Sequence, residues 1–247
     1  MCAAMQAVNV IYRHSIATRI LHWLNALCVF IVLMSGLQIF NAHPRLYWGE
    51  YGANTDRAFI QISGNAATGE KAFPHWATIP SWQDLAGGRR WHFFFAWVLV
   101  LNSALYLLIS SASGHVRRDL LPTRQEISPR HITRDFLDHL RLRSSRGDAA
   151  KSYNVLQKLA YLGVVFGLAP MMLLTGLAMS PGIDAAAPWL LDVFGGRQSA
   201  RTLHFLTAML IALFIAVHIV MVILAGPVNE LRSMITGRFT LPMDEGE

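Results

Sequence analysis

The sequence lacks charge for its length: only 15% of its 247 residues are Asp, Glu, Lys or Arg, while 53% are hydrophobic. A soluble domain of ordinary composition carries about a quarter charged residues. The deficit is concentrated in four long apolar runs, none of which contains Asp or Glu. This scarcity argues against an ordinary soluble globule and predicts a membrane protein.

Cysteine is scarce as well. Cys2 and Cys28 are the two cysteines of the chain, and no CxxC motif exists. Thiolate ligation of an iron–sulfur cluster or of zinc is therefore not expected. A di-metal carboxylate site, the common use of histidine in a helical bundle, needs Glu and Glu-x-x-His motifs inside the helices. The apolar runs hold no acidic residue, so this site is excluded too.

The four apolar runs cover residues 16–40, 91–112, 155–179 and 202–225. At 1.5 Å per residue each is long enough to cross about 30 Å of hydrocarbon. The first run is too long for the core of a signal peptide and lacks a cleavage pattern, so we expect it to be retained. The sequence thus predicts an all-α, integral membrane four-helix bundle, a single domain over residues 1–247.

Basic residues predict the orientation. Nine Lys and Arg residues lie between the second and third runs, at about 113–154. The positive-inside rule then places this loop and both termini on the cytoplasmic side of a multi-pass membrane protein. The net charge of +6 needs no nucleic-acid partner, because a basic loop beside a membrane contacts anionic lipid headgroups. The loop at about 41–88, with Trp48, Trp76 and Trp82, is expected on the periplasmic side.

Four histidines interrupt the apolar runs: His22, His92, His204 and His218. Ionisable groups inside a span are costly and usually functional. Fourteen residues, or 3.9 turns, put His204 and His218 on one helix face about 21 Å apart. Helix direction sorts the four by depth, pairing His92 with His204 in the outer half and His22 with His218 in the inner half. Two bis-imidazole sites of this kind match the axial ligands of two b-type haems.

Neighbouring residues favour the same interpretation. Arg19, Arg89 and Arg201 each precede one of these histidines by three residues, one turn nearer the membrane surface. An arginine fork pairs well with the carboxylate of a haem propionate. Gly36, fourteen residues after His22, would let a flat ring approach the first helix. A weak likeness between RILHWL…SGL and QKLAYL…TGL hints at an old duplication.

Taken singly, a histidine near a helix end is more often a packing or interfacial residue than a ligand. The remaining six histidines keep that simpler interpretation, because they are expected in loops or at helix ends: His14, His43, His75, His115, His131 and His139. A non-redox membrane protein that uses histidines as proton relays, such as a transporter subunit or an assembly factor, is a competing hypothesis. A colourless purified protein would favour it.

Three stretches carry a family resemblance: residues 13–40 around His22, GRRWHFFFAWVLVLN around His92, and the fourth run followed by GPVNELRSMITGR. They resemble the bacterial cytochrome b561 superfamily, and more closely the cytochrome b subunits of nickel–iron hydrogenase and thiosulfate reductase type. The resemblance covers nearly the whole chain. It implies a location in the bacterial inner membrane and two haem b groups with the pairing His22–His218 and His92–His204. The outer loop of nearly fifty residues departs from the family pattern.

No catalytic acid, nucleophile or nucleotide motif is present, so the resemblance implies an electron-transfer subunit. It would connect a periplasmic redox enzyme, a molybdopterin oxidoreductase or alternatively a hydrogenase, to the membrane quinone pool. A second alternative from the same superfamily is a self-sufficient, quinone-coupled superoxide oxidase.

Overall fold

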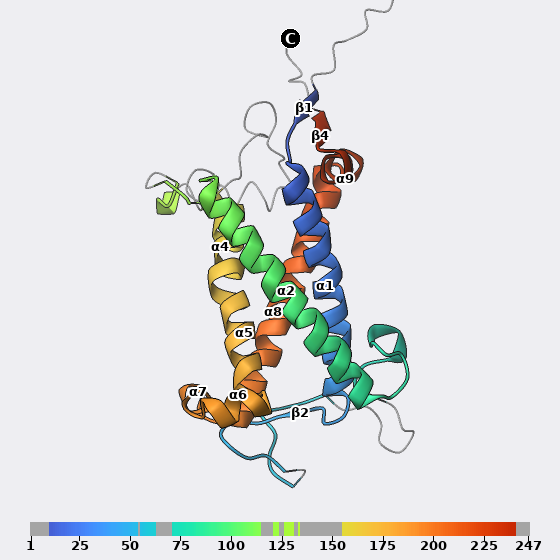
Figure 1. The fold of residues 1–247 in the computed structure, drawn as a ribbon, viewed down its shortest axis with the longest axis vertical. Coiled ribbons are helices and arrows are strands. Elements are labelled where there is room, and N and C mark those ends of the chain that lie inside the picture. Colours follow the sequence, from blue (N-terminus) through green and yellow to red (C-terminus); the bar gives the residue numbers. More distant parts are fainter. Residues whose placement is uncertain are drawn as a thin grey trace, which may run out of the picture. The chain divides into compact units, whose positions relative to one another are not determined.

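The computed structural model describes residues 10–53, 55–62, 71–114, 121–123, 126–130, 133 and 155–240. Within these residues, four segments are long and apolar enough to cross a membrane (Figure 1): α1 (Ile16–Phe40), α2 (Leu85–Ala112), a third span (Val155–Ala178) and α8 (Arg197–Ala225). The prediction of an all-α, multi-pass membrane protein is confirmed. Most of the predicted basic loop 113–154 lies outside the described residues.

Two of the helices begin earlier than the apolar pattern predicted. α2 starts at Leu85 instead of residue 91, and α8 starts at Arg197 instead of residue 202. The backbone N–H of Gly87 donates to Asp84 Oδ1 at 2.7 Å, so Asp84 caps the first turn of α2. The added turns are rich in Arg, Gln, Ser and Gly, which a hydropathy pattern does not count as part of a span.

The third span is not one regular helix. It consists of α4 (Val155–Gly163), a π-helical turn η4 (Val164–Leu168) and α5 (Ala169–Ala178). Pro170, in the first turn of α5, has no backbone N–H and would clash with the carbonyl one turn earlier in a regular α-helix. The wider π-turn directly before it relieves that clash.

The contacts divide the chain into two compact units. Unit 1 comprises the described residues up to Trp23, from Leu105 to Gly163 and from Phe214 onward; unit 2 comprises the described residues from Leu24 to Ala104 and from Val164 to Leu213. The boundary between the units cuts every long span, so each unit contains one part of each span. His92 and His204 fall in unit 2, and His22 and His218 fall in unit 1.

In unit 2, the loop after α1 is fastened to the start of α8. Gln198 and Ser199 donate their backbone N–H groups to the carbonyl of Gly49, and Thr202 Oγ1 donates to the Tyr47 carbonyl at 2.6 Å. Gly49 has φ +93°, a left-handed conformation that glycine adopts without strain. The short strands β2 (Arg45–Leu46) and β3 (Ile60–Gln61) pair antiparallel in this loop. These hydrogen bonds hold the segment around Tyr47 and Gly49 against the first turns of α8, which also carry Arg201.

The rest of unit 2 outside the spans is short and helical. A 3₁₀ turn, η1 (His75–Ala77), precedes α2, and α6 (Pro181–Ala186) and α7 (Trp189–Val193) connect α5 to α8. A small apolar cluster of Ala178, Leu190, Leu191 and Ala200 packs α7 against the end of α5 and the start of α8.

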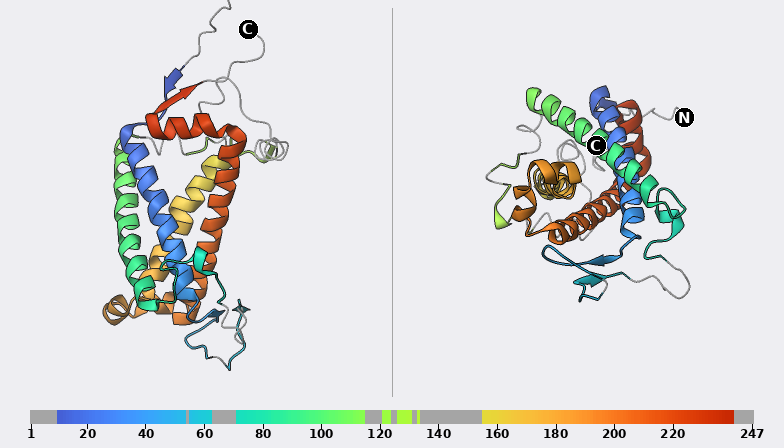
Figure 2. Two further views of the ribbon diagram at one scale, coloured as in Figure 1. Left: turned by 90° about the vertical axis from the view of Figure 1, so that its right-hand side faces the viewer. Right: turned by 60° about the horizontal axis from the view of Figure 1, so that its bottom comes forward.

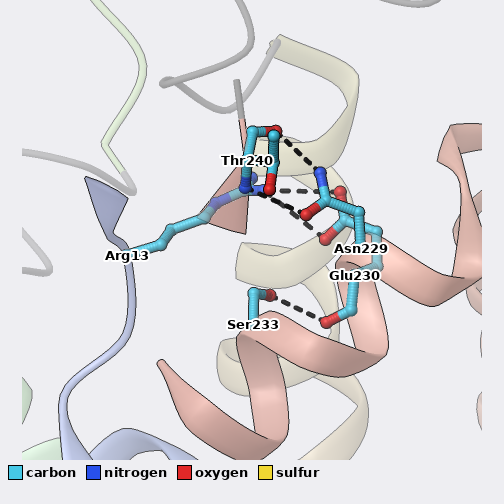
Figure 3. Close-up of polar contacts among 5 residues, drawn as sticks. All are labelled: Arg13, Asn229, Glu230, Ser233 and Thr240. Carbon is cyan, nitrogen blue, oxygen red and sulfur yellow. Dashed lines mark hydrogen bonds and ion pairs between the residues drawn. The ribbon is translucent and has the colours of Figure 1, made fainter. Parts of the chain in front are cut away.

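In unit 1, the polar face of the C-terminal helix α9 (Pro227–Thr236) is bound to the N-terminal strand. β1 (Val10–Tyr12) pairs antiparallel with β4 (Arg238–Thr240), Arg13 forms a 3.3 Å ion pair with Glu230, and Asn229 bonds the backbone of Thr240 twice (Figure 3). Ser233 Oγ donates to the Glu230 carbonyl.

The opposite face of α9 is apolar and exposed, with Val228, Leu231 and Ile235 81%, 45% and 63% accessible. A single residue, Gly226 with φ +103°, separates α9 from the span α8, and α9 turns across the end of α8 (Figure 2). A short helix with an exposed apolar face directly beside a span is typical of a helix in the membrane interface.

Candidate functional site

His92 on α2 and His204 on α8 face each other within unit 2. Their ring centroids lie 6.2 Å apart, with the ring planes inclined at 63°. A bond between a metal and an imidazole nitrogen is about 2 Å long, so two imidazoles on opposite sides of one metal ion bring their centroids to about 6 Å. The pair therefore has the separation of two axial ligands.

A hydrogen bond fixes the tautomer of His92. Its Nδ1 atom lies 3.0 Å from the carbonyl oxygen of Val32 and 3.3 Å from Ser35 Oγ, both on α1. A carbonyl can only accept, so Nδ1 carries the proton. The other ring nitrogen, Nε2, then keeps its lone pair and can bind a metal.

His204 is held in the same way from the third span. Its Nδ1 atom lies 2.9 Å from Thr175 Oγ1. The Thr175 hydroxyl donates its own proton to the Met171 carbonyl at 2.6 Å, so its oxygen accepts from the imidazole. The carbonyl of Met172 is a further backbone acceptor for this ring. His204 is thus also protonated on Nδ1, with Nε2 free for a metal.

A glycine lies against each of these two rings. A Cβ atom built on Gly36 would lie 3.4 Å from Cε1 of His92, and one built on Gly176 would lie 3.4 Å from Cε1 of His204. The ring that lies beside Gly36 in the structure is the imidazole of His92. Whether a haem also lies there stays a prediction.

The residues of α1 that contact His92 and the residues of α5 that contact His204 have the same spacing in the sequence. In α1 they come from VLMSGL, residues 32–37, and in α5 from MLLTGL, residues 172–177. Carbonyl, hydroxyl and glycine stand at the same relative positions in both. Ser35, Thr175 and Gly176 were not among the site residues predicted from sequence. The shared SGL and TGL letters were the available signal, but without a structure they pointed to no histidine.

His22 on α1 and His218 on α8 form the second pair, inside unit 1. Their ring centroids lie 6.5 Å apart with the planes inclined at 60°. Trp23 packs edge-on against His22, and Phe214 stacks on His218 at 6.2 Å and 18°. Among the described residues, neither ring of this pair has a hydrogen-bond partner. In this part of the chain, the two imidazoles are in contact with aromatic side chains.

The three predicted arginines have different surroundings. Arg201 donates to the backbone carbonyls of Arg45, at 3.0 Å, and of His43, and its guanidinium lies over the Phe40 ring. Arg19 donates to the carbonyl of Ile235 and lies 3.4 Å from the hydroxyl of Tyr12, while its buried Nε atom has no hydrogen-bond partner among the described residues. Arg89 is exposed. Each guanidinium has N–H donors that a haem propionate could use. The pairing of these arginines with propionates stays a prediction.

The donor set selects one class of metal group. In the described part of the chain, no three His, Cys, Asp or Glu side chains come together as ligands of a bare ion. Each pair offers two opposed imidazoles and no third ligand. A bare Zn²⁺ or Fe²⁺ ion needs about four to six ligands, whereas an iron porphyrin brings four of its own and needs two. The residues present therefore fit a planar iron macrocycle.

Comparison with known proteins agrees with this chemistry. Residues 13–237 match the family model described as prokaryotic cytochrome b561. A putative protein-methionine-sulfoxide reductase subunit, YedZ1, from Azospira oryzae is 31% identical over 219 residues, which cover 89% of this chain and 93% of that protein. A probable Ni/Fe-hydrogenase B-type cytochrome subunit from Cupriavidus necator is 21% identical over 248 residues, covering 95% of this chain and 89% of that subunit.

Proposed function

Since this chain belongs to the prokaryotic cytochrome b561 family, a family of membrane cytochromes with b-type haem, we propose that it holds two haems and carries electrons between a redox enzyme and quinone. The observation that carries the proposal is the presence of two separate histidine pairs with ring centroids 6.2 and 6.5 Å apart. The resemblance inferred from the sequence motifs is confirmed at the level of the family.

Each pair would hold one haem. His92 and His204 would bind one iron through Nε2, since both Nδ1 atoms are already occupied. His22 and His218 would bind the other. Bound haem supplies a one-electron couple on its iron. The protein contributes the ligands, the apolar helix surfaces that exclude water, and the hydrogen bonds that orient the rings.

The two centres share helices, which suits electron transfer between them. α1 and α8 each contribute to both sites: α8 carries one ligand of each pair, and α1 carries His22 together with the Val32 and Ser35 contacts of His92. Among the described residues, each pair consists of two opposed imidazoles, and no group of three His, Cys, Asp or Glu side chains comes together as metal ligands. We infer a conduit rather than a catalytic site, with catalysis left to a partner.

Similarity to subunits of a reductase and of a hydrogenase supports a redox enzyme as that partner. The higher identity to the reductase subunit favours a reductase, and we propose a periplasmic molybdopterin oxidoreductase supplied with electrons from quinol. The loop after α1 is the proposed docking surface. Its exposed Trp48, Trp76 and Trp82 offer large aromatic contacts, and a cavity of about 430 Å³ between Trp82, Arg90 and Trp91 adds a concave feature.

Absorption spectroscopy of the purified protein tests this proposal. The dithionite-reduced protein should show a b-type α band, and a pyridine haemochrome assay should count two haems per chain. One haem or none per chain would overturn it. Superoxide-driven reduction of quinone by the protein alone would support the oxidase alternative instead of a partner-dependent conduit.

A further inference from the structure

We infer that the hydroxyl groups of Ser35 and Thr175 position both ligands of the His92–His204 centre and lower its midpoint potential, whereas the residues that the structure describes place no such hydroxyl at the His22–His218 centre. This inference rests on the proposed haem ligation by the four histidines. It assigns to two uncharged residues of α1 and α5 a role in setting the redox difference between the two centres.

The direction of each hydrogen bond follows from the neighbouring atoms. Ser35 Oγ donates to the Ile31 carbonyl at 2.7 Å, and Thr175 Oγ1 donates to the Met171 carbonyl at 2.6 Å. The single proton of each hydroxyl is thereby used within its own helix. Each oxygen can then only accept from the histidine beside it, at 3.3 Å for Ser35 and 2.9 Å for Thr175. The Nδ1–H of His92 is shared, since it also donates to the Val32 carbonyl at 3.0 Å.

Both oxygens are fixed in place. Ser35 and Thr175 are fully buried, and each hydroxyl is tied to the carbonyl four residues earlier on its own helix. Their one rotatable side-chain bond is therefore locked. A ring that donates to such an oxygen keeps both its tautomer and its plane, which pre-organises Nε2 toward the iron.

A hydrogen bond that Nδ1–H donates to an oxygen atom also changes the electronic properties of the histidine ligand. It raises the basicity of the imidazole, so the ring donates more electron density through Nε2. A more basic axial ligand stabilises ferric iron over ferrous iron, which lowers the midpoint potential. At this centre both rings make such a bond, so the two effects act in the same direction.

Among the described residues, the His22–His218 centre has no hydroxyl that accepts a hydrogen bond from its imidazoles. Among the described residues, His22 and His218 contact aromatic side chains, namely Trp23 and Phe214, and no hydrogen-bond acceptor. Replacing the hydroxyls should therefore act on one midpoint potential and leave the other unchanged. This selectivity separates ligand positioning from a general loosening of the fold.

The experiment compares Thr175→Val, Ser35→Ala and Thr175→Ser in the full-length protein by potentiometric titration of the haem absorbance. Thr175→Val removes the hydroxyl acceptor of His204 while keeping the side-chain shape, and Thr175→Ser retains the hydroxyl. Thr202→Val is the matched control, because Thr202 is an equally buried threonine of the same unit whose hydroxyl binds the Tyr47 carbonyl instead.

We expect Thr175→Val to raise one of two midpoint potentials, and Thr175→Ser and Thr202→Val to leave both unchanged. Ser35→Ala should raise the same potential by less, because the Val32 carbonyl still accepts from His92. The low-spin ferric EPR signal of the same haem should shift in Thr175→Val, because it reports the angle between the ligand planes. Unchanged potentials in Thr175→Val, or an equal shift in Thr175→Ser, would overturn the inference. If Thr175→Val loses one haem that Thr175→Ser retains, positioning is supported; loss in both variants overturns it. Fewer than two haems in the unmodified protein would refute the proposed function itself.

Discussion

Gly36 on α1 lies against the edge of the His92 ring on α2, so that a methyl group added at Gly36 would sit 3.4 Å from Cε1. That distance is ordinary van der Waals contact, which means that the ring just fills the space left by the missing side chain. Gly176 on α5 has the same relation to His204. Each imidazole is therefore confined between a glycine on one helix and the opposing imidazole.

Larger side chains at these glycines should displace the ligand. Alanine would only touch the ring, so Gly36→Ala and Gly176→Ala should keep two haems. A branched side chain extends beyond the Cβ into the ring, so Gly36→Val and Gly176→Val should each lose one haem of two. Haem content per chain, by pyridine haemochrome, measures this. Gly163→Val is the control, since nothing lies within 4 Å of its added Cβ; a full haem complement in Gly176→Val would contradict the argument.

The histidine pairs test the ligand assignment directly. His204→Ala should lose the haem held with His92 and keep the other, and His218→Ala should lose the haem held with His22. The two variants should therefore each retain one b-type haem, with different midpoint potentials. His75→Ala removes an exposed histidine outside the spans and should retain both. If His204→Ala and His218→Ala retain the same haem, the pairing is wrong.

The sequence predicted the parts of this fold that depend on one-dimensional pattern. Hydropathy identified four spans, and the pairing of the histidines followed from counting residues from each membrane face. Depth alone brought His92 to His204 and His22 to His218, and the ring separations agree with that order. Such counting works because α1, α2 and α8, which carry the four histidines, are continuous helices with a fixed rise per residue.

What the pattern could not predict depends on contacts across helices. Ser35 and Thr175 are ordinary residues in apolar runs until the helix that carries each histidine packs beside them. Arg201 stands one turn from His204, as a propionate partner should, yet its direction toward the carbonyls of His43 and Arg45 depends on how the loop after α1 folds back. The π-turn before Pro170 likewise needs the backbone geometry.

Arg201 should hold the loop after α1 in place. Its guanidinium donates to two carbonyls of that loop, which a neutral amide of different shape cannot reproduce. Arg201→Gln should therefore speed tryptic cleavage at Arg45 several-fold in detergent solution. Arg90→Gln, a change at an exposed arginine, should leave the cleavage rate as it is. Equal cleavage rates in the Arg201 variant and the unmodified protein would show that the loop does not depend on this contact.

An ion pair at the start of the third span should make stability depend on pH. Lys158, whose side chain is 9% exposed, lies 2.9 Å from a carboxylate oxygen of Glu126, whose side chain is 25% exposed. The backbone N–H of Thr123 and then the Lys158 ammonium lower the pKa of Glu126 below its ordinary value of 4.5. A carboxyl with a depressed pKa stabilises the fold above its ordinary pKa, and this contribution is lost as the pH falls below 4.5 through the lowered value.

Glu126→Gln should remove that pH dependence and leave a buried ammonium without its counterion. Breaking a fully buried pair costs about 3–5 kcal/mol, and the partial exposure of Glu126 reduces the expected loss to about 1–3 kcal/mol. The measurement is the thermal unfolding midpoint in detergent, followed by tryptophan fluorescence at pH 7 and pH 4. At pH 7 the midpoint should fall in Glu126→Gln. It should recover in the double variant that also carries Lys158→Met. Asp192→Asn, at an exposed carboxylate of α7, is the control. A midpoint at pH 7 that Glu126→Gln does not change would mean that solvent or a lipid headgroup, not Glu126, stabilises the Lys158 charge.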